Sequence, residues 1–101
     1  MGQTIEATFT PTKPETIMNL VGINDANLRL IEESYDVQVT DTGSEIEVTG
    51  EESIVKKIMQ IFTALDKVVT RGVTITATDV VSAIKMADKG TLEFFGELYN
   101  K

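Results

Sequence analysis

The stretch from Gly22 to Gly50, GINDANLRLIEESYDVQVTDTGSEIEVTG, decides the fold, because a turn, a helix and a hairpin follow one another within it. Gly22 suits the end of one helix, and Asn24 or Asp25 can accept hydrogen bonds from the free amides that open the next helix. Apolar residues then recur at helical spacing over residues 27–35, with charged residues on the opposite side. The stretch therefore predicts a tight turn followed by a short amphipathic helix.

Two alternating segments complete this stretch. Apolar and polar residues alternate over residues 37–40 and again over residues 45–49, which is the period of a strand with one buried face. The connection between them contains Gly43, which can adopt a positive φ at no steric cost. An antiparallel hairpin is predicted.

The same reasoning predicts one more strand and three more helices outside this stretch. Residues 5–9 alternate like a strand, and Pro14 suits the first turn of a short helix. The helical period returns from about Glu52 to Thr70, which is expected to be the longest helix. The segment Thr76-Ala77-Thr78-Asp79 has the pattern of a capping box, so a further helix is predicted, ending at Lys89-Gly90.

Composition bounds the class of protein. A chain of 101 residues is long enough for one compact domain, and 42% hydrophobic with 25% charged residues are ordinary globular proportions. There is no cysteine and no histidine, so disulfides, thiol or imidazole catalysis, and zinc sites built from these residues are excluded. Adjacent carboxylates such as Glu32-Glu33 lack a base, a nucleophile or a metal-ligand partner. The inventory therefore favours a chain that is not an enzyme.

Charge and hydropathy limit the partners. Nine basic residues against sixteen acidic residues give a formal net charge of −7, which on average repels a nucleic acid. Screening limits the reach of distant charges to roughly 8–10 Å, so a local basic strip can still attract phosphate. The N-terminal residues lack a signal-peptide pattern, and no run approaches the ~20 apolar residues of a membrane span. We expect a cytoplasmic protein that does not enter a membrane.

The order strand, helix, helix, strand, strand, helix resembles an α+β fold, the type I KH-like domain (β-α-α-β-β-α), which has a three-stranded antiparallel sheet. In this chain, extra C-terminal helices are expected to follow the KH-like elements. Together with RGVTITATDV, residues 71–80, the stretch quoted first also resembles the N-terminal region of PhoH-like proteins, the phosphate-starvation-inducible predicted ATPases. The resemblance covers residues 20–99. It implies a KH-like N-terminal domain over residues 1–88, and an aromatic C-terminal tail over residues 89–101 that leads towards a P-loop ATPase domain.

The same resemblance implies that ATP is bound elsewhere. A P-loop has the pattern GxxxxGK[ST], and no Gly-Lys dipeptide occurs in this chain. ATP and magnesium are therefore expected in the absent domain of the parent protein. This chain is expected to need no cofactor and to hold no catalytic or metal-binding residue. The resemblance also implies that the parent protein acts on RNA.

KH domains clamp a sugar-phosphate backbone with a GXXG turn between two small helices. The matching turn here is Gly22-Ile23-Asn24-Asp25, in which an acidic side chain replaces the second glycine. Weak contacts with single-stranded RNA are expected from Lys13, Gly22, Asn24, Asn27 and Arg29. Two alternatives remain open: the turn is no more than a pair of helix caps, and Arg29 pairs with Glu32 or Glu33 instead of a phosphate.

The aromatic tail has two interpretations. Its apolar residues either fold back on their own core or contact the downstream ATPase domain or another copy of the chain; they are Phe94, Phe95, Leu98 and Tyr99. Neighbouring helical side chains point about 100° apart, so one of the two adjacent phenylalanines is expected to be partly exposed.

Two functional hypotheses follow from the sequence. One is a module that positions RNA or organises the assembly of the parent ATPase, and the other is a degenerate KH fold that makes only protein-protein or inter-domain contacts.

Overall fold

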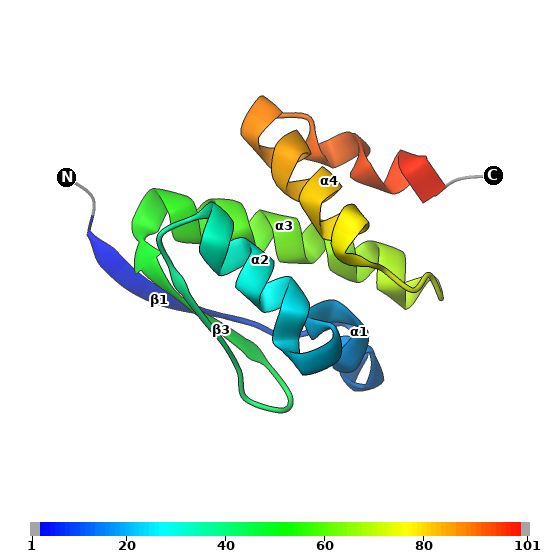
Figure 1. Cartoon of the computed structure of the whole chain (residues 1–101), viewed down its shortest axis with the longest axis horizontal. Coiled ribbons are helices and arrows are strands. Elements are labelled where there is room, and N and C mark those ends of the chain that lie inside the picture. Colours follow the sequence, from blue (N-terminus) through cyan, green and yellow to red (C-terminus); the bar gives the residue numbers. More distant parts are fainter. Residues whose placement is uncertain (1–2, 100–101) are drawn as a thin grey trace.

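The computed structural model describes residues 3–99 and contains one antiparallel sheet in the strand order β1-β3-β2 (Figure 1). The strands are β1 (Thr4–Phe9), β2 (Gln38–Asp41) and β3 (Ile46–Glu51). Val48 of the central strand lies opposite Ala7 of β1 and Val39 of β2. Since paired residues point to the same side of a sheet, the apolar residues of all three strands share one face. The predicted pairing of the first strand with the hairpin is confirmed.

The α-helices lie in the order that the sequence predicts, and 3-10 helices accompany them, one of them in the predicted tight turn. The helices are η1 (Pro14–Thr16), α1 (Ile17–Val21), η2 (Ile23–Asp25), α2 (Ala26–Ser34), α3 (Glu52–Thr70), α4 (Ala77–Lys89) and η3 (Leu92–Tyr99), where η denotes a 3-10 helix. The order β-α-α-β-β-α up to the end of α3 confirms the KH-like α+β class. None of these helices, within residues 3–99, combines the length and the apolar character that crossing a membrane requires.

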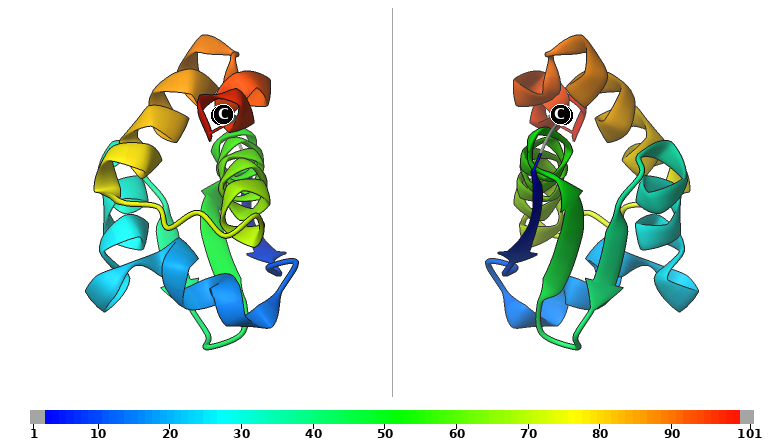
Figure 2. Two further views of the ribbon diagram at one scale, coloured as in Figure 1. Left: turned by 90° about the vertical axis from the view of Figure 1, so that its right-hand side faces the viewer. Right: turned by 90° about the vertical axis from the view of Figure 1, so that its left-hand side faces the viewer.

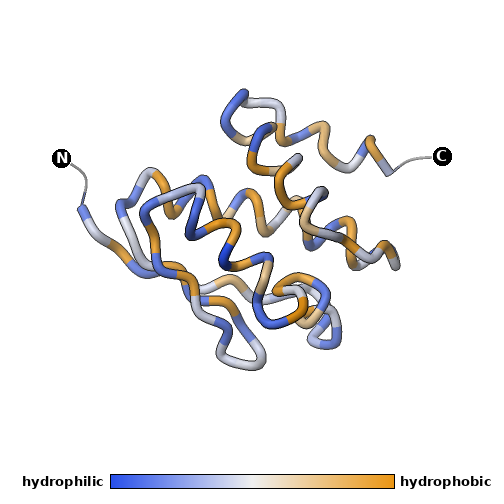
Figure 3. The backbone as a smooth tube through the Cα atoms, viewed as in Figure 1, coloured by the Kyte–Doolittle hydropathy of each residue, from blue (hydrophilic) through white to orange (hydrophobic). Residues whose placement is uncertain are grey.

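Helix α3 lies between two layers. One side packs on β1 and β3, and another side packs on α4 and η3 (Figure 2). Apolar residues recur along the whole helix and along α4 (Figure 3). The apolar side chains of α3 that are buried are Val55, Ile58, Ile61, Phe62, Leu65, Val68 and Val69. Because the helix is covered on both sides, its buried band is wider than the single stripe of a surface helix.

One charged residue on α3 is also buried. Asp66 is 6% exposed, and its carboxylate accepts hydrogen bonds from the hydroxyl and from the backbone amide of Thr12. Asp66 lies beside the buried apolar residues of the helix, on the side that faces Thr12. The segment that follows β1 crosses that side and supplies the donors, so the carboxylate fixes this segment against α3.

One carboxylate near the C-terminal end of α4 binds α3 and the residue that follows α2. Asp88 accepts hydrogen bonds from the hydroxyl of Tyr35 at 2.8 Å and from the ammonium group of Lys57 at 3.1 Å. The same ammonium group lies over the Tyr35 ring, 5.6 Å from its centroid. The hydrogen bond from Tyr35 and then that from Lys57 lower the pKa of Asp88. These contacts link the added helix to the KH-like part.

Candidate interaction site

The turn between α1 and α2 has an uncommon backbone. Gly22 has a φ of 80° and a ψ of 173°, a combination that is essentially restricted to glycine. Asn24 and Asp25 both have a left-handed φ, at 55° and 59°. Asp25 occupies the N-cap position of α2, but its side chain forms no cap hydrogen bond. The predicted side-chain cap is therefore wrong, because a capping residue needs an extended backbone.

Asn27 holds this turn from the inside. Its side chain is 4% exposed, and its amide nitrogen donates to the backbone carbonyl of Leu20 at 3.0 Å. A Cβ added at Gly22 would stand 3.0 Å from the Asn27 Cγ atom, so the glycine makes room for this amide. Asn27 therefore serves the fold, contrary to the expectation that its side chain is available to RNA.

Asn19 of α1 fixes the connection between α3 and α4 beside the turn. Its amide nitrogen donates to the carbonyl of Val73 at 2.9 Å, and its oxygen accepts from the amide of Ile75 at 3.1 Å. Sequence reasoning missed this residue, because a single asparagine in a short helix carries no signal of a partner 54 or 56 residues away. These two hydrogen bonds hold the segment around Ile75 next to the turn.

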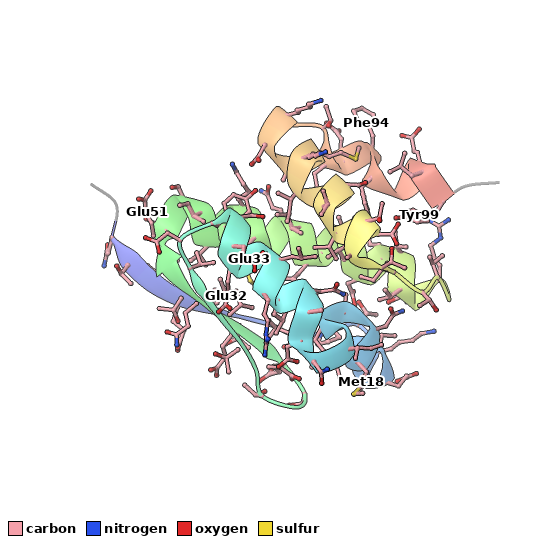
Figure 4. The ribbon with its side chains drawn as sticks, in the orientation of Figure 1. Met18, Glu32, Glu33, Glu51, Phe94 and Tyr99 are labelled. Atoms are coloured by element: carbon pink, nitrogen blue, oxygen red, sulfur yellow. The ribbon has the colours of Figure 1, made fainter. Side chains whose placement is uncertain are left out.

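A cavity of about 670 Å³ opens between the turn and this segment. It is lined by Met18, Asn19, Gly22, Ile23, Ala26, Asn27, Thr74, Ile75, Thr76 and Ala77, none of which is charged. Two of the lining side chains are largely in solvent, since Met18 is 77% exposed and Ile23 is 86% exposed (Figure 4 labels Met18). We call Met18, Ile23 and the cavity beside them the turn surface. The turn surface therefore exposes two large apolar side chains beside a cavity without charged lining residues.

The two cations expected beside the turn are both exposed. Lys13 immediately precedes η1, and Arg29 lies on the outward side of α2. Arg29 forms no ion pair with Glu32 or Glu33 among the described residues, so the predicted pairing is wrong. One carboxylate oxygen of Glu32, which Figure 4 labels, accepts a hydrogen bond from the backbone amide of Val39 at 2.9 Å instead. The structure therefore brings Gly22, Asn24 and Asn27 together but links neither cation to them.

The described part of the tail, which ends at Tyr99, divides its apolar residues between two environments; the last two residues of the predicted tail lie outside the described residues. Phe95 is fully buried, and its ring contacts the Tyr99 ring edge-on with the centroids 5.4 Å apart. Phe94, which Figure 4 labels, is 50% exposed, and Leu98 is 59% exposed. The prediction that one of the adjacent phenylalanines is partly exposed is confirmed. The tail folds back on its own core and still presents apolar groups to solvent.

Tyr99 also binds the start of α4. Its hydroxyl donates to Asp79, whose other carboxylate oxygen closes the predicted capping box by accepting from the Thr76 amide at 2.7 Å. Burial acts to raise the pKa of Asp79, but the hydrogen bonds from Tyr99 and Thr76 outweigh it and lower this pKa. The carboxylate thus joins a helix cap to the tail.

Replacing Tyr99 by phenylalanine should therefore make the free energy of unfolding depend less on pH in the acidic range. A carboxylate whose pKa is lowered in the folded state adds stability above its unfolded pKa of about 3.9, and this stability is lost as the pH falls through the folded value. The stability difference between wild type and Tyr99→Phe should be present at pH 7 and should shrink below about pH 4. Urea unfolding of the two proteins at pH 7 and below pH 4 measures this difference in stability. A difference that is the same at both pH values would contradict the hydrogen bond from Tyr99 to Asp79.

Comparison with known proteins places the chain among its relatives. No protein-family model and no solved structure matches it. A PhoH-like protein of Bacillus subtilis (strain 168) is 30% identical over 88 residues, which make up 87% of this chain and 28% of the relative. The chain therefore spans little more than a quarter of that protein's length. This similarity confirms, over most of the chain, the resemblance to the PhoH-like family.

Proposed function

We propose that this chain is a non-catalytic KH-like module that makes protein contacts within a larger PhoH-like ATP-binding protein. The turn surface carries the proposal. Met18 and Ile23 extend into solvent at the position where a KH domain clamps phosphate. Large apolar side chains that stand in solvent beside an apolar cavity gain free energy when a partner covers them. A protein surface is the partner that fits this chemistry.

Two carboxylates, one at each end of α2, oppose nucleic-acid binding. Asp25 occupies the position of the second glycine of a GXXG turn and adds a negative charge where phosphate would lie. Glu32 covers the Val39 amide at the edge of β2, which is a group that could otherwise hydrogen-bond a base. The net charge of −7 repels a nucleic acid as well. The two carboxylates and the net charge therefore favour protein contacts over RNA binding.

The partner in this proposal is the ATPase domain of the parent protein. The chain corresponds to only 28% of its PhoH-like relative, which leaves most of that protein's length for other domains. ATP and magnesium would be held there, and the present chain would organise the assembly. The second exposed apolar site, formed by Phe94 and Leu98 of the tail, suits the same role.

Weak RNA binding is the second candidate function, because Arg29 is exposed and its guanidinium pairs with none of the described carboxylates. If this candidate holds, Arg29→Ala should weaken binding several-fold. Asp25→Gly should strengthen it by a similar factor, because the change removes a negative charge from the turn. The same change relieves a left-handed conformation that costs about 1 kcal/mol, so the variant should remain folded. No cap hydrogen bond is lost by that substitution.

The measurement is a fluorescence-anisotropy titration of a labelled single-stranded oligouridylate at low and at physiological salt. Binding through phosphates must weaken steeply as salt is added, because counterions are released. The contact proposal predicts that neither substitution changes the signal while both variants stay folded. Saturable, salt-sensitive binding that the two substitutions shift in opposite directions would establish the RNA function instead.

A further inference from the structure

The outer side of β1 is an open sheet edge. The Gln3 carbonyl accepts a hydrogen bond from the Glu52 amide at 2.8 Å, and these two residues continue the register of the β1-β3 pair. In an antiparallel pair, hydrogen-bonded residues alternate along the strand. The main-chain groups of residues 3, 5, 7 and 9 therefore face β3, and those of Thr4, Glu6 and Thr8 face outward. No hydrogen bond within residues 3–99 reaches the amides of Glu6 and Thr8.

The opposite edge of the sheet is protected, so β1 is the edge that a partner can use. The edge strand β2 has four residues, and the carboxylate of Glu32 covers the outward amide of Val39. The edge strand β1 has six residues and lies at the margin of the sheet in both views of Figure 2. Natural proteins usually shorten or cover their edge strands, because free amides and carbonyls pair readily with another strand.

The charges beside this edge select the partner. The sheet face that bears Glu6 is made of alternate residues of the three strands, and these are Thr4, Glu6, Thr8, Gln38, Thr40, Glu47, Thr49 and Glu51. Glutamate is the only charged residue among them. Opposite charges on neighbouring strands stabilise a pair, and like charges destabilise it. A second copy of the chain paired through β1 would bring its own Glu6 to this edge, with Glu47 and Glu51 of each copy one strand further in. A segment with lysine or arginine would instead place a positive charge beside Glu6.

We propose that β1 is a docking site for an extended basic segment of a partner protein, which adds to the sheet as a fourth strand. Lysine or arginine at alternate positions would lie beside Glu6, with Glu47 and Glu51 of β3 one strand further in. The residues between them would continue the apolar face formed by Ile5, Ala7 and Phe9. Main-chain hydrogen bonds to Glu6 and Thr8 would supply the affinity, and the alternating charges would supply the specificity. This site is separate from the turn surface of the contact module.

The test is an NMR titration of the ¹⁵N-labelled chain with a synthetic peptide of sequence TKVKVKT. The amides of Glu6 and Thr8 should shift and should exchange with solvent about tenfold more slowly in the bound state. The matched peptide TEVEVET should not bind. Glu6→Pro should abolish binding and still fold, because proline is tolerated where an edge amide points away from the sheet. Glu6→Thr keeps the amide and should weaken binding only about threefold.

Several results would overturn the proposal. These are binding that leaves the Glu6 and Thr8 amides unchanged, equal affinity for both peptides, no saturation at millimolar peptide, and self-association of the chain through β1. A folded Glu6→Pro variant that binds the basic peptide as tightly as the wild type would also overturn the proposal. If Glu6→Pro does not fold, the amide shifts of wild type and Glu6→Thr decide the question by themselves.

Discussion

Phe95→Ala should lower the free energy of unfolding by about 3–5 kcal/mol, whereas Phe94→Ala at the adjacent position should lower it by less than about 1 kcal/mol. Phe95 is fully buried among the side chains of the core and packs against Tyr99, so its removal leaves a cavity. Phe94 stands half in solvent and leaves no such cavity. Urea unfolding of the two variants measures the difference.

Each variant serves as the control for the other, because both substitutions remove a phenyl ring from the same 3-10 helix. Similar losses at the two positions would show that the tail is not docked as described. A large loss for Phe95→Ala alone would establish that η3 is part of the core, and that Phe94 is free to contact a partner.

Gly22→Ala should lower the free energy of unfolding by about 2–4 kcal/mol, the sum of backbone strain and overpacking. The backbone of Gly22 is in a region that other residues rarely adopt, and the new Cβ would press on the Asn27 amide. Gly90→Ala is the matched control, since Gly90 also has a positive φ, 76°, but open space around the added Cβ. The control should cost about 1 kcal/mol. Equal losses in thermal or urea unfolding would rule out the close contact between Gly22 and Asn27.

The sequence was sufficient for features that depend on neighbouring residues. Alternation over residues 37–40 and 45–49 predicted the hairpin, because period and turn chemistry are local properties. The capping box of Thr76 and Asp79 and the helix that it opens were predicted for the same reason. The resemblance to a KH-like domain then placed the first strand beside the hairpin, and the register confirms it.

The residues that shape the site could not be predicted, because their partners are distant in the chain. Asp66 binds Thr12 across 54 residues, and Asn19 binds Val73 across the same separation. Spacing shows which side of its own helix a residue occupies, but it does not show which segment will cross that side. The alternative in which Arg29 pairs with Glu32 or Glu33 rested on helical spacing alone, and nothing in that spacing reveals that the Val39 amide binds the Glu32 carboxylate.

The central claim is that the turn surface contacts protein. Its most direct test is a calorimetric titration of this chain with the PhoH-like ATPase domain proposed as its partner, produced separately. We predict that Met18→Ser combined with Ile23→Ser weakens the affinity at least about tenfold, because two exposed apolar side chains leave the contact. Leu98→Ser in the tail is the control for losing an exposed apolar group elsewhere. Unchanged affinity of a folded Met18→Ser, Ile23→Ser variant would contradict the claim.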